Sequence, residues 1–145
     1  MIVIPDQSYP EIRESVRRLC EDYPGPYWQS LDSDRRYPTE FVDAITQAGF
    51  LSALIPEEYG GSGLGLSAAA AILEEVQRSG CNGGAAHAQM YTMGTVLRHG
   101  NEMQKQSYLP RIASGELRLQ AFGVTEPTAG TDTTRISTFA RREGD

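Results

Sequence analysis

The chain has 145 residues, 39% of them hydrophobic, and its 19 acidic and 13 basic side chains give a formal net charge of −6. This length supports one core of ordinary size, and the acidic balance, without a Lys/Arg cluster, argues against a nucleic-acid partner. The uncharged run Gly83–Leu97 is too short to cross a bilayer. We therefore expect a soluble protein. Cys20 and Cys81 are far apart in the sequence and form no C-x-x-C motif, so we expect a reducing, cytoplasmic compartment. No metal site is predicted.

The N-terminal segment predicts one amphipathic helix followed by a loop. Ser8 and Glu11 have the spacing of a capping box, and apolar residues recur at helical spacing after them. The Pro24–Gly25–Pro26 run predicts the end of this helix, and the residues from there to Arg36 are expected to form a polar connection. Trp28 is interpreted as a packing residue beneath that connection rather than as a ligand-stacking residue.

A second helix is predicted between Pro38, which suits a first turn, and Gly49, which suits the position after a last turn. Four glycines follow, at positions 60, 61, 63 and 65. Because no Lys-Ser/Thr pair comes after them and the G-x-G-x-x-G spacing fails, they indicate a turn that reverses the chain, not a phosphate-binding loop.

Three further helices are predicted, and the middle one is the most apolar. Ser67 is the expected N-cap of a helix that runs to Arg78, on which Glu74 and Glu75 are expected to be exposed. The next helix, Ala85–His99, has no charged residue before its last turn, so it is predicted to be buried centrally.

Two residues of this region have local interpretations. His87 is interpreted as a core histidine, since no carboxylate lies near it in sequence to orient it. Asn101 is the expected N-cap of the following helix, which Pro110 is expected to kink or split.

The hydrophobic period changes at Glu116 from helical to strand-like, which predicts a domain boundary. Alternation over Leu119–Val124 predicts a half-buried strand, and Glu126-Pro127 should stop it. Residues 136–142 predict a second strand, which enters a hairpin turn at 143–145 with no second arm. We therefore expect the chain to end inside a β-domain.

The turn between these two predicted strands gathers hydroxyl groups around a glycine. Its polar members are Thr125, Thr128, Thr131 and Asp132, and they surround Ala129-Gly130. Hydroxyls and unpaired N–H groups beside a glycine suit a phosphate or the edge of a heteroaromatic ring. The alternative is an ordinary Thr-rich turn whose hydroxyls bond their own backbone.

Three motifs together resemble one enzyme family. Residues 122–132, F-G-V-T-E-P-x-A-G-T-D, resemble the signature that opens the middle β-domain of acyl-CoA dehydrogenases. Residues 55–64, I-P-E-E-Y-G-G-x-G-L, and residues 100–116 are similar to stretches of that family's N-terminal helical domain. The resemblance implies a mainly α fold: an orthogonal helical bundle over residues 1–116, then the first strands of a truncated β-domain over residues 117–145.

The same resemblance implies the residues of a ligand site. Phe122, Val124 and Thr125 would contact the flavin of FAD, and Gly130 and Thr131 would lie at its pyrophosphate. Thr131 would also touch the CoA part of the substrate. In the family the helix at 85–99 borders the acyl-chain cleft, so Met90, Tyr91, Met93 and Gly94 are candidates to line that cleft, and an interpretation as plain core residues is equally open.

As a whole, the resemblance implies part of an FAD-dependent oxidoreductase of fatty-acid metabolism, which forms an α,β double bond in an acyl-CoA thioester. The family's catalytic glutamate lies in a C-terminal helical domain outside these residues, so no catalytic residue is assigned, and Glu126 is interpreted as a structural carboxylate. An electron-transfer flavoprotein and a homodimer or homotetramer are the implied partners. The alternatives are an acyl-CoA oxidase or flavin monooxygenase of the same fold, and a non-catalytic helical interaction module.

Overall fold

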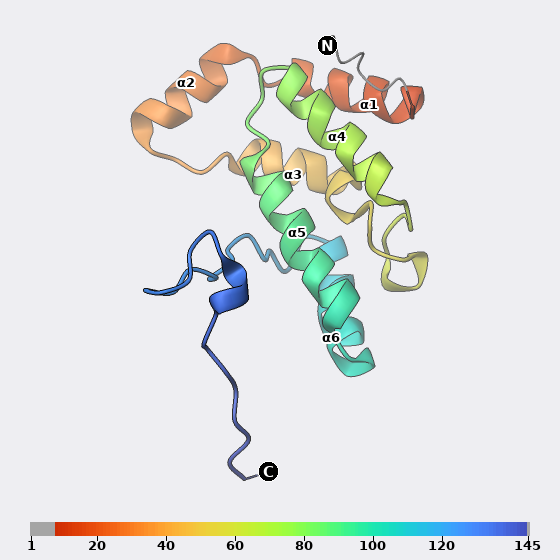
Figure 1. The fold of residues 1–145 in the computed structure, drawn as a ribbon. Coiled ribbons are helices and arrows are strands. Elements are labelled where there is room, and N and C mark those ends of the chain that lie inside the picture. The colour runs from red at the N-terminus through yellow and green to blue at the C-terminus, as the bar shows by residue number, and fades with distance from the viewer. Residues whose placement is uncertain (1–7, 145) are drawn as a thin grey trace, which may run out of the picture.

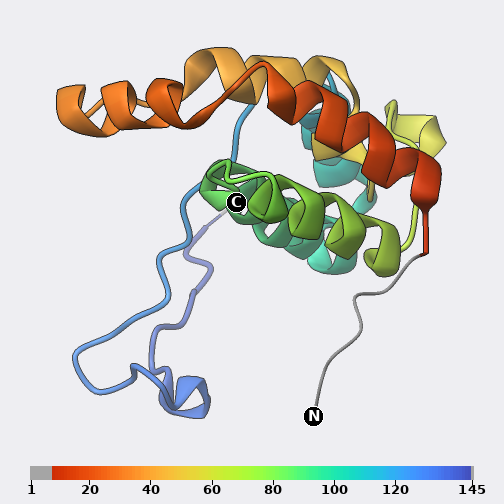
Figure 2. The same ribbon diagram turned by 90° about the horizontal axis from the view of Figure 1, so that it is seen from above.

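The computed structural model describes residues 8–144 and is mainly α-helical (Figure 1), which confirms the mainly α part of the predicted fold class. Its helices are α1 (Pro10–Glu21), α2 (Gly25–Asp34), α3 (Thr39–Gln47), α4 (Leu66–Arg78), α5 (Gly84–His99) and α6 (Glu102–Ala113). Short 3-10 helices are η1 (Phe50–Ser52), η2 (Glu57–Tyr59) and η3 (Thr133–Arg135). Seen from above, α1, α2 and α3 lie in one layer and α4 and α5 lie in a second (Figure 2).

Helix α1 begins one residue later than the sequence suggests. Its N-cap is Tyr9, whose backbone is left-handed with φ of 61°, and no side chain caps the helix. The predicted capping box of Ser8 and Glu11 is therefore wrong. Pro10 follows directly, and its fixed φ and missing N–H suit the first position of a helix better than any later one.

The predicted polar connection after α1 is also wrong, because it forms helix α2. Pro24 is the N-cap of α2 and Pro26 lies in its first turn, where a proline loses no hydrogen bond. The same three residues thus end one helix and begin the next. The role predicted for Trp28 is confirmed: its indole N–H donates to the Tyr23 carbonyl at 2.8 Å, and its ring packs edge-on against Phe41 at 5.0 Å.

Helix boundaries farther along follow local signals with two exceptions. Asn101 caps α6 as predicted, since its side chain accepts from the N–H of Gln104 at 2.9 Å. The Gln104 side chain in turn accepts from the N–H of Asn101 at 2.9 Å. Pro110 does not split α6, which stays continuous because buried residues on both sides of the proline anchor the last turn. Helix α4 starts after Gly65, so Ser67 is not its N-cap.

The glycine-rich turn between η2 and α4 reverses the chain, as predicted. At Gly61 a Cβ atom would lie 2.1 Å from the Ile55 carbonyl oxygen, so only glycine lets the two arms of this turn approach so closely. The N–H of Gly63 then donates to the same carbonyl at 2.8 Å. This close packing brings the chain back to begin α4 beside α1.

Two buried clusters form the core. The first joins α1, α3, α4 and the start of α5, and it includes Val16, Phe41 and Ile72, each at most 2% exposed. The second joins the η1–η2 connection to α5 and α6. Its members are Ile55, Met93, Leu109 and Ile112, all 0% exposed. Helix α5 contributes to both clusters and so ties the two halves of the domain together.

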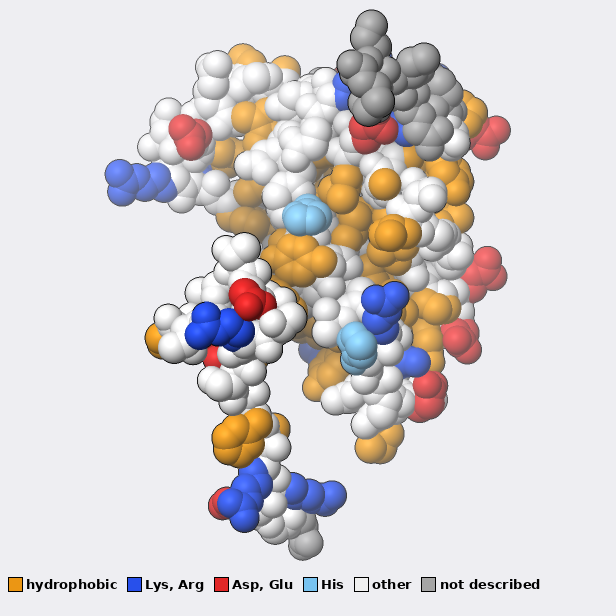
Figure 3. Space-filling model, viewed as in Figure 1, with side chains coloured by type: hydrophobic (Ala, Val, Ile, Leu, Met, Phe, Trp, Pro, Cys, Tyr) orange, Lys and Arg blue, Asp and Glu red, His pale blue; other side chains and the backbone are white. Residues whose placement is uncertain are grey.

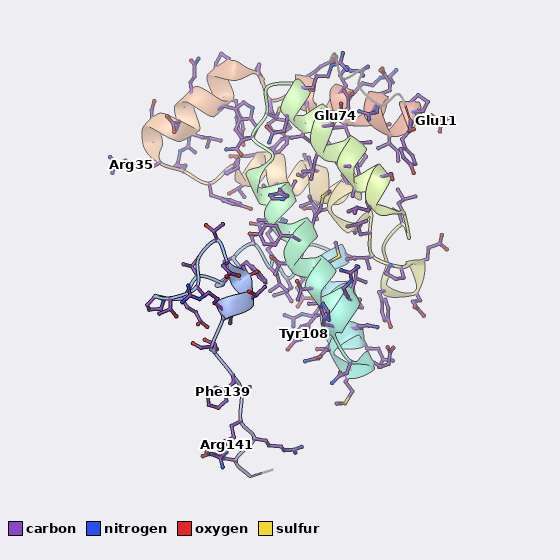
Figure 4. The ribbon with its side chains drawn as sticks, viewed as in Figure 1. Glu11, Arg35, Glu74, Tyr108, Phe139 and Arg141 are labelled. Atoms are coloured by element: carbon purple, nitrogen blue, oxygen red, sulfur yellow. The ribbon has the colours of Figure 1, made fainter. Side chains whose placement is uncertain are left out.

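A buried ion-pair network fastens α1 to α4, where the sequence predicts exposed glutamates. Glu75 is 1% exposed and accepts from Arg13 and Arg17, both at 3.2 Å. Arg13 also donates to Glu74 at 2.7 Å, and this hydrogen bond raises the pKa of Arg13. Glu74 lies on the side of α4 that faces α1 (Figure 4). The predicted exposure of Glu75 is therefore wrong, because its partners come from a helix about sixty residues earlier.

Gln89 on α5 is fully buried, and neither polar atom of its amide has a hydrogen-bond partner within the described residues. An unpaired buried amide costs about 1–3 kcal/mol. We expect Gln89→Met, which keeps the length of the side chain, to raise the free energy of unfolding by about 1–3 kcal/mol. Urea denaturation measures the change, with exposed Gln106→Met as the control, expected within about 0.5 kcal/mol. A loss of stability in Gln89→Met would show that the amide is satisfied by solvent.

The two predicted strands, at 119–124 and 136–142, are wrong for the part of the chain that the structure describes. Residues 8–144 contain no strand, and only an isolated bridge joins Glu126 to Ala129. A strand needs a neighbour to take up its N–H and C=O groups, and these residues supply none. Residues 117–122 instead lie against the helices, and the chain after them runs away from the helices with the short helix η3 in its course (Figures 1 and 2). Of the predicted hairpin turn, Asp145 lies outside the described residues.

Candidate functional site

An apolar groove runs along the surface between α4 and α5. One cavity in it, of about 390 Å³, is walled mainly by side chains from these two helices. Its lining residues are Leu54, Leu66, Ala69, Ala70, Leu73, His87, Met90 and Tyr91. A second cavity, of about 450 Å³, shares four of these residues and continues past Gly94 to His99. Hydrophobic side chains gather over this face in Figure 3. We call the two cavities together the α4–α5 groove.

Helix α5 has an exposed face, which the prediction of an entirely buried helix misses. Tyr91 is 40% exposed, and His87 is exposed and packs edge-on against it at 5.1 Å. The interpretation of His87 as a core histidine is therefore wrong. The sequence misleads here because α5, although only partly covered, lacks the charged stripe that normally marks an exposed helix face.

The structure separates the residues of α5 that the sequence groups as cleft candidates. Met90, Tyr91 and Gly94 line the groove, and the space beside Gly94 is open, with no atom within 4 Å of where a Cβ would lie. Met93 is 0% exposed and packs into the second core cluster. Met93 therefore supports α5 from beneath, while the other three residues face the groove.

Four hydrogen bonds anchor the start of the C-terminal segment to the helices. Arg118 donates to Asp43 at 2.6 Å and to Thr46 at 2.9 Å, both on α3. Gln120 donates to the Ala85 carbonyl of α5 at 3.2 Å and accepts from the hydroxyl of Tyr37. We call these contacts the 118–120 tether. They hold the following residues next to the groove.

Phe122 makes a second contact between this segment and α5, after the hydrogen bond of Gln120 to Ala85. Its ring packs edge-on against Tyr91 at 5.7 Å and is still 55% exposed. Within residues 8–144, the N–H groups of residues 121–125 donate to no other group of the chain. The groove is thus bordered by an aromatic ring and by backbone donors that remain available.

The Thr-rich turn is closed by one carboxylate. Glu126 accepts from the N–H groups of Ser137 and Thr138, both at 2.8 Å, which confirms its predicted structural role. Hydrogen bonds from Thr138 and Ser137 lower the pKa of Glu126 from 4.5 to about 2. Because the folded pKa is the lower one, the ionised carboxylate stabilises this loop above pH 4.5. That contribution is lost as the pH falls toward 2.

The predicted cofactor residues fall on one exposed turn. The Glu126–Ala129 bridge, with N···O distances of 2.9 and 3.1 Å, draws together the two arms that carry Thr125 and Gly130. Thr125 and Thr131 are both exposed, so neither hydroxyl is enclosed in the apolar interior. Nothing lies within 4 Å of a Cβ built on Gly130. Such a turn offers hydroxyls, free N–H groups and close access to backbone, which suits an anionic or heteroaromatic ligand.

The described residues contain no candidate metal site and no helix that could span a membrane. Between Ser8 and Gly144, no group of three or more His, Cys, Asp or Glu side chains is placed to hold a metal ion. No helix of this part of the chain is long and apolar enough to cross a membrane.

Comparisons of the sequence and of the fold with known proteins point to the same family. Residues 6–116 match the family described as acyl-CoA dehydrogenase, N-terminal domain. The mitochondrial isovaleryl-CoA dehydrogenase of Bos taurus is 32% identical over 97% of this chain and 34% of its own length. This chain therefore spans about a third of the length of the curated relatives that it matches.

Two solved structures share the fold and a comparable identity. The glutaryl-coenzyme A dehydrogenase in its glutaryl-CoA complex has a TM-score of 0.76 and 30% identity, over 94% of this chain and 36% of that one. An acyl-CoA dehydrogenase of Bacillus anthracis complexed with FAD has a TM-score of 0.70 and 31% identity, over 91% of this chain and 23% of that one. Since the family match extends over most of the chain, the protein belongs to the acyl-CoA dehydrogenase family, of which it contains the N-terminal domain.

Proposed function

We propose that this chain is part of an FAD-dependent acyl-CoA dehydrogenase that introduces an α,β double bond into an acyl-CoA thioester. The observation that carries the proposal is the contact of Phe122 with Tyr91, which places the Thr-rich segment beside the α4–α5 groove. A ligand that lies across this contact meets backbone donors on one side and an apolar groove on the other. FAD and an acyl chain have those two kinds of surface.

The exposed turn has the chemistry that FAD requires. The available N–H groups of residues 121–125 and the Thr125 hydroxyl can bond the polar edge of the flavin, with Phe122 and Val124 beside the ring. Gly130 and Thr131 can approach a pyrophosphate, because the glycine adds no side chain and the hydroxyl is exposed. When bound, FAD supplies the acceptor for the hydride that leaves the substrate.

The groove fits the acyl part of the substrate. We assign contact with the acyl chain to Met90, Tyr91 and Gly94, since all three line the groove, and contact with the CoA part to Thr131. Met93 acts there only through its support of α5, because the second core cluster encloses its side chain. Thioether and aromatic walls adapt to different apolar chains, so the groove itself fixes no chain length.

No residue of this chain is proposed as the catalytic base. Glu126 is already bonded to Ser137 and Thr138, which keeps its carboxylate at the turn and away from the groove. The proposal therefore needs a carboxylate from outside residues 8–144. It also includes an electron-transfer flavoprotein as the electron acceptor and assembly into a homodimer or homotetramer, both on family grounds.

The test is the loss of two hydroxyls from the turn. In a polypeptide of full family length that contains this chain, Thr125→Ala with Thr131→Ala should weaken FAD binding by about tenfold or more, since each lost hydrogen bond contributes about 0.5–1.5 kcal/mol. Titration of apoprotein with FAD, followed by flavin fluorescence, measures this change. Thr128→Ala, on the same turn but outside the proposed site, is the matched control and should leave the affinity unchanged. Wild-type affinity in the double variant would instead favour a non-catalytic helical interaction module.

A further inference from the structure

The two cysteines of the chain meet in the folded protein, although 61 residues separate them. Cys20 lies in the last turn of α1, and Cys81 lies in the connection between α4 and α5. The Cys81 thiol donates to the carbonyl oxygens of Cys20 at 3.8 Å and of Tyr23 at 3.7 Å, so it lies across the end of α1. Both residues are 3% exposed.

The two cysteines belong to the same buried cluster, and the Cys81 sulfur lies against the backbone of Cys20. Burial, and then the neighbouring Cys81 thiol, raise the pKa of Cys20 to about 12. Cys20 is therefore a protonated thiol at neutral pH, and it packs in the first core cluster together with Cys81. The reduced pair is stable in this state because each sulfur is shielded from bulk solvent.

Each cysteine nevertheless borders a cleft of its own. A cleft of about 480 Å³ reaches Cys20 between Arg17 and Arg78, whose guanidinium groups also pair with Glu75 on its wall. A second cleft, of about 450 Å³, reaches Cys81 from the α2 side. A reagent that enters the first cleft meets the exposed edge of Cys20, with Glu21 and Glu75 lining the cleft beside the two arginines.

The chain around Cys81 can accommodate a change of sulfur position. Gly80, directly before it, has a left-handed backbone with φ of 80°, and nothing lies within 4 Å of a Cβ built there. Residues 79–83 are a turn and not part of a helix. Cys81 therefore lies outside both helices, and within residues 8–144 a single backbone hydrogen bond, from its N–H to the Val76 carbonyl at 3.2 Å, joins it to α4.

We infer that Cys20 and Cys81 are a site of reversible oxidation, at which a low-molecular-weight disulfide converts the two thiols into an intramolecular disulfide. One cysteine loses its proton, its sulfur attacks a sulfur of the reagent, and a mixed disulfide forms while the released reagent thiolate takes up a proton. The second cysteine then displaces the second reagent thiol, and the Sγ–Sγ bond forms. Two electrons and two protons pass from the protein to the reagent, which leaves as two thiols.

The disulfide joins the end of α1 to the α4–α5 connection and closes a loop of about sixty residues, which restricts the unfolded chain. It would act at the same helix pair that Arg13 and Glu75 already hold together. We expect the melting temperature to rise by about 5–15 °C on oxidation and to return on reduction.

The experiment treats the 145-residue chain with oxidised glutathione in native buffer. Because the chain has only 2 cysteines, intact mass spectrometry distinguishes an internal disulfide, which loses two hydrogens, from a glutathione adduct. We expect the internal disulfide, a Cys20–Cys81 peptide after digestion without reductant, and full reversal by dithiothreitol. Cys20→Ser and Cys81→Ser should each stop at the glutathione adduct and show no rise in melting temperature on oxidation.

Three outcomes would overturn the inference. These are two free thiols after treatment in native buffer, a wild-type product that stops at the glutathione adduct, and disulfide-linked dimers in place of the internal bond. Circular dichroism of each Ser variant checks that it folds. Should one variant fail to fold, the other variant and the wild-type peptide map still decide the question.

Discussion

Glu75→Ala should lower the free energy of unfolding by about 3–5 kcal/mol, a large share of the stability of a domain of this size. The Glu75 carboxylate is 1% exposed and accepts from Arg13 and Arg17. Arg13 is itself 6% exposed, so the substitution leaves a buried guanidinium with only Glu74 to compensate it. Breaking a buried ion pair from one side costs far more than the pair contributes, because the remaining charge stays desolvated.

Urea denaturation of the chain, followed by circular dichroism, measures this effect. Glu14→Ala is the matched control: Glu14 also pairs with two arginines, Arg17 and Arg18, but its side chain is 47% exposed. Its loss should cost less than about 1 kcal/mol, since solvent screens exposed pairs. Equal costs for the two glutamates would mean that the network between α1 and α4 is hydrated and contributes little.

Met93→Ala should have the second large effect and lower the free energy of unfolding by about 2–5 kcal/mol. Met93 is 0% exposed and fills the second core cluster between α5 and α6, so its truncation leaves a cavity. A substitution at the next residue, Gly94, should change the free energy of unfolding in the opposite direction. Gly94→Ala meets no atom within 4 Å and should stabilise α5 by about 0.5–1 kcal/mol, the difference in helix propensity.

Paired denaturation curves of these two variants test which side of α5 faces the core. Opposite signs are expected at neighbouring positions, and a destabilising Gly94→Ala would contradict the open groove. In an enzyme of full length, the same alanine should narrow the groove and change the preference for acyl chains. Met93→Ala should instead lower the free energy of unfolding and leave the preference for acyl chains largely unchanged, because Met93 does not line the groove.

Signals confined to a few neighbouring residues predict this structure well. The Asn101 cap of α6 depends on groups three residues apart, and the end of α3 depends on Gly49 with φ of 79°. Both follow from local backbone chemistry. The helical fold class is predictable for the same reason, as are the turn at Gly61 and the packing role of Trp28.

Features that depend on distant partners could not be predicted. The burial of Glu75 requires Arg13 from another helix, and the approach of Cys81 to Cys20 requires α1 and α4 to pack. The strands predicted after residue 118 need neighbours that these residues do not supply. In the site, the motif at 122–132 indicates which residues to consider. The near-uniform apolarity of α5 conceals that Met90 and Met93 point in different directions.

The 118–120 tether has a consequence for the order of events during synthesis. Its anchor points are Asp43 and Thr46 on α3, Tyr37 just before α3, and Ala85 on α5, all of which leave the ribosome before the segment that they hold. Domains generally fold as units from the N-terminus while the chain is still growing. The folded helices can thus bind Arg118 and Gln120 as soon as these residues are synthesised. This binding fixes the direction in which the following residues leave the helical domain.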